Sequence, residues 1–168
     1  MKKLILGLLA LGLTTQFYAQ VVDEGMLPEI EVHAMNYKYL NSIDNSAAPV
    51  DIKLLERKVA NFDLKSSDFY EDEFDFYKVY FFIPDGKIVA AYNPDGKVMY
   101  TIEKFKNTKL PKSVSQSVAK KFPGWVITKD VYKLSYSKTK GVTKTYKLIL
   151  DNGIKTLRVK TDENGVFL

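Results

Sequence analysis

The sequence predicts an α+β protein built from tandem helix-plus-antiparallel-β-meander repeats, with the helices packed on one face of the sheet. Two segments, 50–62 and 110–122, carry apolar residues at helical spacing. Short β-rich runs follow each of them and are separated by Asp-Gly and Asn-Gly pairs, which favour tight hairpin turns. The chain has 168 residues, of which 46% are hydrophobic and 27% charged. This composition is globular, and the length suits one medium domain or two small ones that share a core.

The first 19 residues have the layout of a secretory signal peptide. Lys2 and Lys3 precede an apolar run at residues 4–13. That run is too short to cross a bilayer, for which about 20 apolar residues are needed. We therefore expect cleavage near Ala19 and a periplasmic or secreted protein without a membrane span.

Residues 20–48 are predicted to form an N-terminal strand and a linker. Apolar and polar positions alternate over residues 28–33, which indicates a strand. The polar residues 41–48 indicate a linker before the first helix.

Residues 49–103 form the first predicted unit, which is acidic. Pro49 stands at the start of the helix predicted over 50–62, a position that proline favours. An acidic and aromatic loop, residues 66–75, separates this helix from the sheet. Three strands are expected after the loop, at residues 76–83, 87–92 and 97–103.

Residues 104–168 form the second predicted unit, which is basic and repeats the same order. Leu110-Pro111 begins its helix, and Pro123-Gly124 ends it. Three strands and a short apolar end are expected after the helix, at residues 125–136, 142–150, 156–160 and 166–168. The strand blocks of the two units align without a gap, because Gly96 follows Tyr77 at the same spacing at which Gly165 follows Tyr146.

The second unit contains four short motifs in a fixed order. They are Leu110-Pro111, Phe122-Pro123-Gly124-Trp125, Tyr146-Lys147-Leu148, and Asp162 to Gly165 before an apolar end. In this order they resemble the PepSY-like, β-lactamase-inhibitor-like domains found in exported proteins of Bacteroidetes-type bacteria. Residues 50–103 resemble these domains more faintly. The resemblance implies a helix packed on an antiparallel sheet, often in tandem. The inhibitor that names the family is such a tandem and binds enzymes with its sheet face, although none of its contact residues can be placed on this sequence.

The charge of the chain is divided between its two units. The full chain has a net charge of +5. Residues 20–103 hold 8 Lys and Arg against 16 Asp and Glu, a net charge of −8, whereas residues 104–168 hold 15 against 4, a net charge of +11. We expect the two halves to attract each other, within the chain or between chains. Export and the acidic half both argue against a nucleic-acid partner.

The residue types offer little catalytic chemistry. The chain has no cysteine, a single histidine and no Gly-x-Ser-x-Gly motif. His33 could share a strand face with Glu29 and Glu31, but such a set is more often plain surface than a metal site. The acidic run 68–75 lacks the spacing of a calcium-binding EF-hand loop. We therefore predict that the protein is not an enzyme and that it holds no metal and no cofactor.

Strand alternation assigns a candidate binding face. Two apolar sets, residues 77, 79 and 81 and residues 146, 148 and 150, are assigned to the core under the helices. The helix-free face then carries the candidate binding residues Tyr80, Phe82, Val89, Lys147, Ile149, Arg158 and Lys160. Two alternatives remain at this point: the N-terminal strand or the other repeat could cover the aromatic residues, and the basic residues could be solvated surface.

The sequence thus predicts an exported, non-catalytic binding module. Its helix-free face is expected to bind a protein of the cell envelope and to restrain an envelope enzyme such as a peptidase. The alternative is a structural or self-associating envelope protein without inhibitory activity, assembled through its oppositely charged halves. Carriage of a small ligand would require an apolar pocket, of which the sequence shows no sign.

Overall fold

The computed structural model describes residues 35–44 and 48–168 of the chain. Several sequence-based predictions lie outside these residues: the signal peptide at 1–19, the strand at 28–33, and the set of Glu29, Glu31 and His33.

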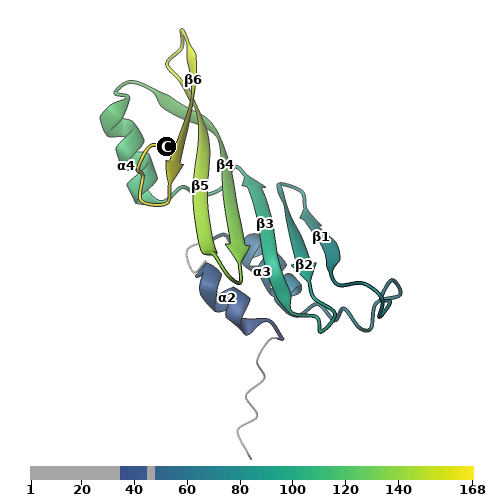
Figure 1. Ribbon diagram of the computed structural model, residues 1–168. Coiled ribbons are helices and arrows are strands. Elements are labelled where there is room, and N and C mark those ends of the chain that lie inside the picture. The colour runs from purple at the N-terminus through teal and green to yellow at the C-terminus, as the bar shows by residue number, and fades with distance from the viewer. Residues whose placement is uncertain (1–34, 45–47) are drawn as a thin grey trace, which may run out of the picture. The chain divides into compact units, whose positions relative to one another are not determined.

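Six antiparallel strands form one sheet in which the spatial order follows the chain order (Figure 1). The strands are β1 (Tyr77–Ile83), β2 (Gly86–Tyr92), β3 (Val98–Lys106), β4 (Val126–Ser137), β5 (Gly141–Asp151) and β6 (Thr156–Asp162). The helices are α2 (Tyr37–Ile43), α3 (Val50–Ala60) and α4 (Lys112–Lys121). The predicted α+β class and the antiparallel sheet are therefore confirmed.

Helices α3 and α4 begin and end close to the predicted positions, for the predicted reasons. Pro49 and Pro111 stand at their N-caps, where the missing N–H of proline costs no helical hydrogen bond. Basic residues occupy the last turn of both helices and complement the helix dipole. Each helix buries an apolar stripe, Ile52, Leu55 and Val59 in α3 and Val114 and Val118 in α4.

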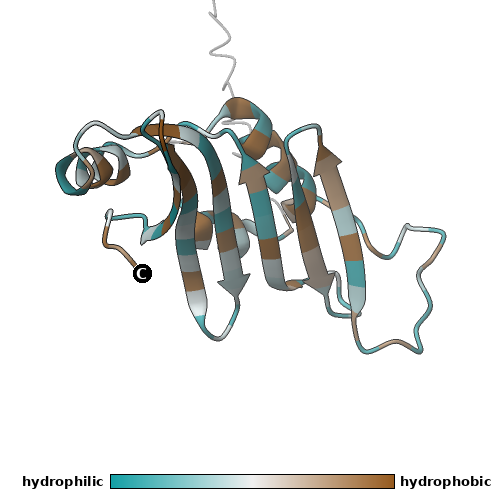
Figure 2. Cartoon of the chain, turned by 90° about the horizontal axis from the view of Figure 1, so that it is seen from above, coloured by the Kyte–Doolittle hydropathy of each residue, from teal (hydrophilic) through white to brown (hydrophobic). Residues whose placement is uncertain are grey.

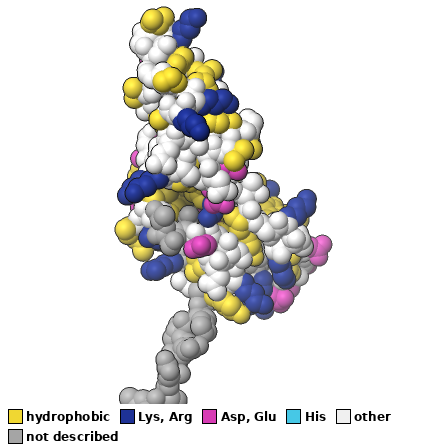
Figure 3. All heavy atoms as spheres, turned by 90° about the vertical axis from the view of Figure 1, so that its left-hand side faces the viewer, with side chains coloured by type: hydrophobic (Ala, Val, Ile, Leu, Met, Phe, Trp, Pro, Cys, Tyr) yellow, Lys and Arg dark blue, Asp and Glu magenta, His cyan; other side chains and the backbone are white. Residues whose placement is uncertain are grey.

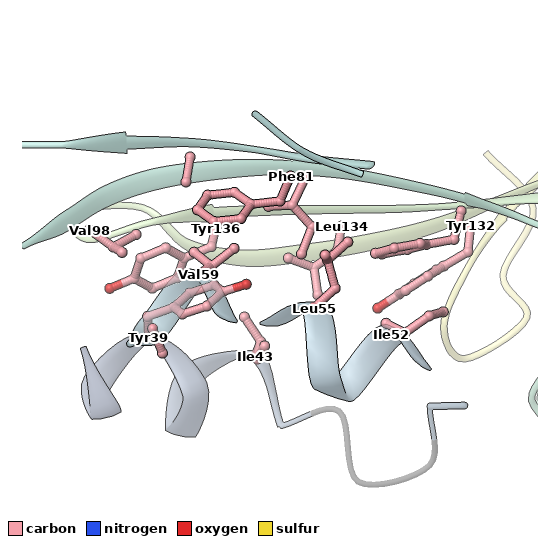
Figure 4. Close-up of a cluster of buried hydrophobic side chains, with 14 of the residues drawn as sticks. Tyr39, Ile43, Ile52, Leu55, Val59, Phe81, Val98, Tyr132, Leu134 and Tyr136 are labelled. Carbon is pink, nitrogen blue, oxygen red and sulfur yellow. The ribbon is translucent and has the colours of Figure 1, made fainter. Parts of the chain in front are cut away.

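The core lies between the helices and one face of the sheet (Figure 4). Apolar side chains of α2 and α3 meet inward-facing residues of the strands, among them Phe81, Leu134 and Tyr136. Val114 and Val118 of α4 belong to the same buried cluster. Because all three helices pack into one core, the opposite face of the sheet is left without a helix.

Helix α2 was not predicted, and it overlaps the predicted linker at residues 41–43. Its seven residues have no side-chain N-cap and no basic residue in the last turn, so the local signals for a helix are weak. Tyr39 and Ile43 are each 1% exposed. Burial against the sheet therefore stabilises this helix, and such burial cannot be seen in the local sequence.

Strand β3 continues to Lys106, three residues beyond the end predicted for it. The predicted boundary between the units, at residues 103 and 104, therefore falls inside a strand. Lys104 and Lys106 were counted with the basic second unit but lie on the last strand of the first three.

Candidate functional site

All seven candidate residues lie on the helix-free face of the sheet. In β1, Tyr77 and Phe81 are buried against the core, whereas Tyr80 and Phe82 are 52% and 65% exposed. The same alternation in β5 and β6 buries Leu148 and exposes the basic residues. These burial patterns follow the alternation predicted for the three strands. At the β5–β6 end, Lys121 of α4 and Phe167 of the C-terminal segment lie next to this face.

An aromatic patch, defined as Tyr80, Phe82, Val89 and Ile102, occupies the β1–β3 end of this face. The register places Tyr80 beside Val89 and Val89 beside Ile102. The rings of Tyr80 and Phe82 stack with their centroids 6.3 Å apart. Ile102 is 56% exposed and is a member that the sequence analysis missed. The β2–β3 hairpin register would have revealed it, because that register puts Ile102 opposite the candidate Val89.

Basic side chains occupy much of the remaining face. The register pairs Lys87 with Lys104 and Lys104 with Lys133, so that lysines stand side by side on three neighbouring strands. Lys147 and Lys160 form a further pair of like charges. Like charges directly opposite each other destabilise a sheet. In Figure 2, hydrophilic segments lie on β3 to β5, and β1 and β2 are more hydrophobic.

A hollow of about 1040 Å³ lies at the β4–β6 end, and we call it the basic hollow. Its basic lining residues are Lys106, Lys121, Lys129, Lys147, Arg158 and Lys160, and its apolar ones include Val131, Ile149 and Phe167. Four of the seven candidate residues thus meet here, while Tyr80, Phe82 and Val89 lie at the other end. On the α4 and β6 side of the molecule, Lys and Arg side chains stand beside apolar ones (Figure 3). No such hollow was predicted from the sequence.

A buried carboxyl group lies on the opposite, core side of β3. Glu103 is 0% exposed and accepts hydrogen bonds from the Tyr39 hydroxyl at 2.8 Å and the Thr101 hydroxyl at 2.9 Å. Its second oxygen, Oε2, is buried and accepts no hydrogen bond of ordinary length and angle from the described residues. The neighbouring Glu56 side chain favours the ionised form of Glu103 when it is itself protonated and donates a hydrogen bond. Burial nevertheless dominates and raises the pKa of Glu103 to about 7. Because this group is sealed from solvent, it affects stability rather than contacting a ligand.

The described residues contain no group of three or more His, Cys, Asp or Glu side chains placed to hold a metal ion. No helix within residues 35–44 and 48–168 combines the length and hydropathy needed to cross a membrane. No family model, no curated protein and no solved structure matches the chain. The function is therefore inferred from the exposed side chains of the helix-free face.

Replacing Lys104 by Gln should stabilise the fold by about 0.5 to 1 kcal/mol, because the change removes two repulsive cross-strand pairs. The gain should shrink as salt screens the repulsion. Lys78 provides a matched control, since it lies opposite Ala91 rather than another lysine. Urea denaturation of the Lys104→Gln and Lys78→Gln proteins at low and high salt measures both effects. An equal change in the two variants would show that the pairing is energetically neutral.

Proposed function

We propose that the protein is an exported, non-catalytic binding module whose helix-free sheet face binds a protein of the cell envelope. We further propose that this binding restrains an envelope enzyme such as a peptidase. The observation that carries the proposal is the aromatic patch, whose three largest side chains are all more than half exposed on a sheet face that the helices leave open.

Exposed aromatic and aliphatic side chains beside a basic surface are typical of a protein-binding site. Full burial of one large apolar side chain contributes about 1.5 to 3 kcal/mol, so the patch supplies a useful anchor. The surrounding lysines would form a polar rim that steers an acidic partner. Together they favour a protein partner that combines apolar and acidic side chains.

We also propose that the chain is a tandem repeat and that it is related to the PepSY-like domains. Two turns, one after β2 and one after β6, have the same hydrogen bonds. In the first turn, the Asn93 N–H donates to the Lys97 carbonyl, and the Lys97 N–H donates to the Asn93 side-chain oxygen. In the second turn, Asp162 and Val166 form the same two hydrogen bonds. The segment after the second turn then bridges back to β6 through Thr161 and Phe167, as β3 pairs with β2. These correspondences support a repeat of β1–β2–β3 in β5–β6 and the segment that follows.

Site-specific photo-crosslinking in the cells that naturally produce the protein tests the proposed function. A p-benzoylphenylalanine residue replaces Phe82 on the helix-free face, and a matched control replaces Leu54, which is 58% exposed on α3. We expect a protein adduct from position 82 and none from position 54. The substitution Ile102→Asp, which places a charge in the aromatic patch, should reduce that adduct about tenfold or more. Equal adducts from both positions, or an adduct that is insensitive to Ile102→Asp, would contradict the proposal.

A further inference from the structure

Among residues 35–44 and 48–168, basic side chains outnumber acidic ones in the lining of the basic hollow, where Asp130 is the one acidic residue. The Asp130 carboxylate already accepts hydrogen bonds from the Thr108 N–H at 3.0 Å and from the Thr108 hydroxyl at 2.8 Å. Because Lys147 and Lys160 also stand opposite each other, the hollow is electrostatically suited to an anionic occupant.

The protein itself contains a segment that is acidic and aromatic, and this segment is suited to a hollow with basic walls. The acidic loop, defined as residues 66–76, holds five carboxylates and no basic residue. Its Phe69, Phe74 and Phe76 are 52%, 51% and 61% exposed. Aromatic residues exposed in an acidic segment match a hollow that has basic walls and apolar side chains between them.

The acidic loop has a defined conformation that would limit the entropy cost of docking. Tyr70 and Tyr77 stack with their ring centroids 5.4 Å apart, and the Tyr77 hydroxyl donates a hydrogen bond to the Glu71 carbonyl. The Ser67 N–H donates to the Leu64 carbonyl at 3.1 Å. A segment held in this way loses less conformational freedom on binding than a flexible one does.

The acidic loop and the basic hollow lie at opposite ends of the same sheet. The loop leads directly into β1, which lies at the opposite edge of the sheet from β6 (Figure 1). The hollow is lined chiefly by residues of β4, β5 and β6. Five strand spacings of about 4.8 Å separate β1 from β6, a distance of about 24 Å. The loop of one chain therefore cannot enter its own hollow.

We propose that the basic hollow of one copy binds the acidic loop of a second copy of this chain. This inference rests on the proposed function, because the hollow is part of the same protein-binding face. Carboxylates of the loop would face Lys147, Arg158 and Lys160, and its phenylalanine rings would lie against Ile149. The contact joins two different surfaces, so each dimer keeps one free loop and one free hollow and can add further copies.

Paired charge reversals test this contact. One variant, Arg158→Glu with Lys160→Glu, reverses two charges of the hollow, and we call it hollow-reversed. The other, Asp72→Lys with Glu73→Lys, reverses two charges of the loop, and we call it loop-reversed. Analytical ultracentrifugation should show a mass that rises with concentration for the unchanged protein at low salt and falls as salt is added. Each variant alone should associate about 100-fold more weakly, because like charges then face each other.

Mixing the two variants gives the decisive result. The hollow-reversed variant keeps a normal loop, and the loop-reversed variant keeps a normal hollow. An equimolar mixture should therefore regain association, because the normal loop of one variant can enter the normal hollow of the other. A matched control, Lys138→Glu with Lys140→Glu, makes the same change in net charge as the hollow-reversed variant at an exposed turn outside the hollow and should associate like the unchanged protein.

A monomeric unchanged protein, a mixture that stays monomeric, or an equal loss of association in the control would each overturn the inference. Thermal unfolding of every variant, followed by circular dichroism, separates a lost contact from a lost fold. A monomeric protein that still yields the Phe82-dependent adduct would overturn this inference alone. Absence of that adduct would instead contradict the proposed function.

Discussion

Replacing Glu103 by Gln is expected to weaken the pH dependence of stability between about pH 5 and pH 8. Burial raises the pKa of this carboxyl from its ordinary value of 4.5 to about 7. The folded protein therefore holds the Glu103 proton more tightly than the unfolded chain does. Stability is greatest below pH 4.5 as far as this group is concerned, and it falls as the pH rises toward 7.

The expected size of this effect is about 3 kcal/mol, since each unit of pKa difference corresponds to about 1.4 kcal/mol. The amide side chain of the Glu103→Gln variant would stay neutral at every pH and could still accept hydrogen bonds from Tyr39 and Thr101. Urea denaturation at about pH 5 and pH 8 measures the difference. Glu71→Gln, a change at an exposed loop position, serves as the control and should keep the pH dependence of the unchanged protein. A pH-independent stability in the unchanged protein would contradict the prediction.

The substitution Gly165→Ala is expected to destabilise the protein by about 3 kcal/mol through two separate effects. Gly165 has a φ of 81°, in the left-handed region where an alanine costs about 1 kcal/mol. An added Cβ would also lie 2.5 Å from the Ser113 carbonyl oxygen and 2.5 Å from the Ser117 hydroxyl, both on α4. The turn and the helix would have to separate, and the Ser113 hydroxyl would lose its hydrogen bond to the Glu163 carbonyl.

Gly153 offers a control that isolates the contact with the helix. It has a φ of 84°, but an added Cβ would meet no atom within 4 Å. Gly153→Ala should therefore destabilise the protein by only about 1 kcal/mol, the cost of placing an alanine in the left-handed backbone region. Thermal or urea unfolding of the two variants measures the difference of about 2 kcal/mol. Equal losses would show that α4 does not rest closely on the turn that contains Gly165.

The strands and their faces could be predicted because their signals are local. Alternation along β1 and β5 separates the buried Tyr77 and Tyr146 from the exposed Tyr80 and Lys147. The turns are equally local, since a glycine such as Gly96 adopts a positive φ that other residues avoid. Helices α3 and α4 carry both an apolar stripe and a proline at the N-cap, so their positions could also be predicted.

The elements that were missed depend on contacts between distant segments. Tyr39 of α2 packs edge-on against Tyr136 of β4 and donates to Glu103 of β3, and neither partner is near it in the chain. Glutamate is seldom fully buried, so the sequence pattern alone does not predict that Glu103 faces the core. Its burial places Ile102 on the open face, which explains why this member of the aromatic patch was not predicted.

The candidate site shows the same division. Local alternation predicted which residues of each strand point away from the core, because a period of two follows from strand geometry and needs no partner strand. Sheet order and register, which depend on pairing across the chain, decided that these residues separate into an aromatic patch and a basic hollow. The join of β3 to β4 through Ile102, Lys104 and their partners makes one continuous face of the two predicted units. Only the tertiary structure could decide this, because hydrogen bonds and packing between segments far apart in sequence set the order of the strands.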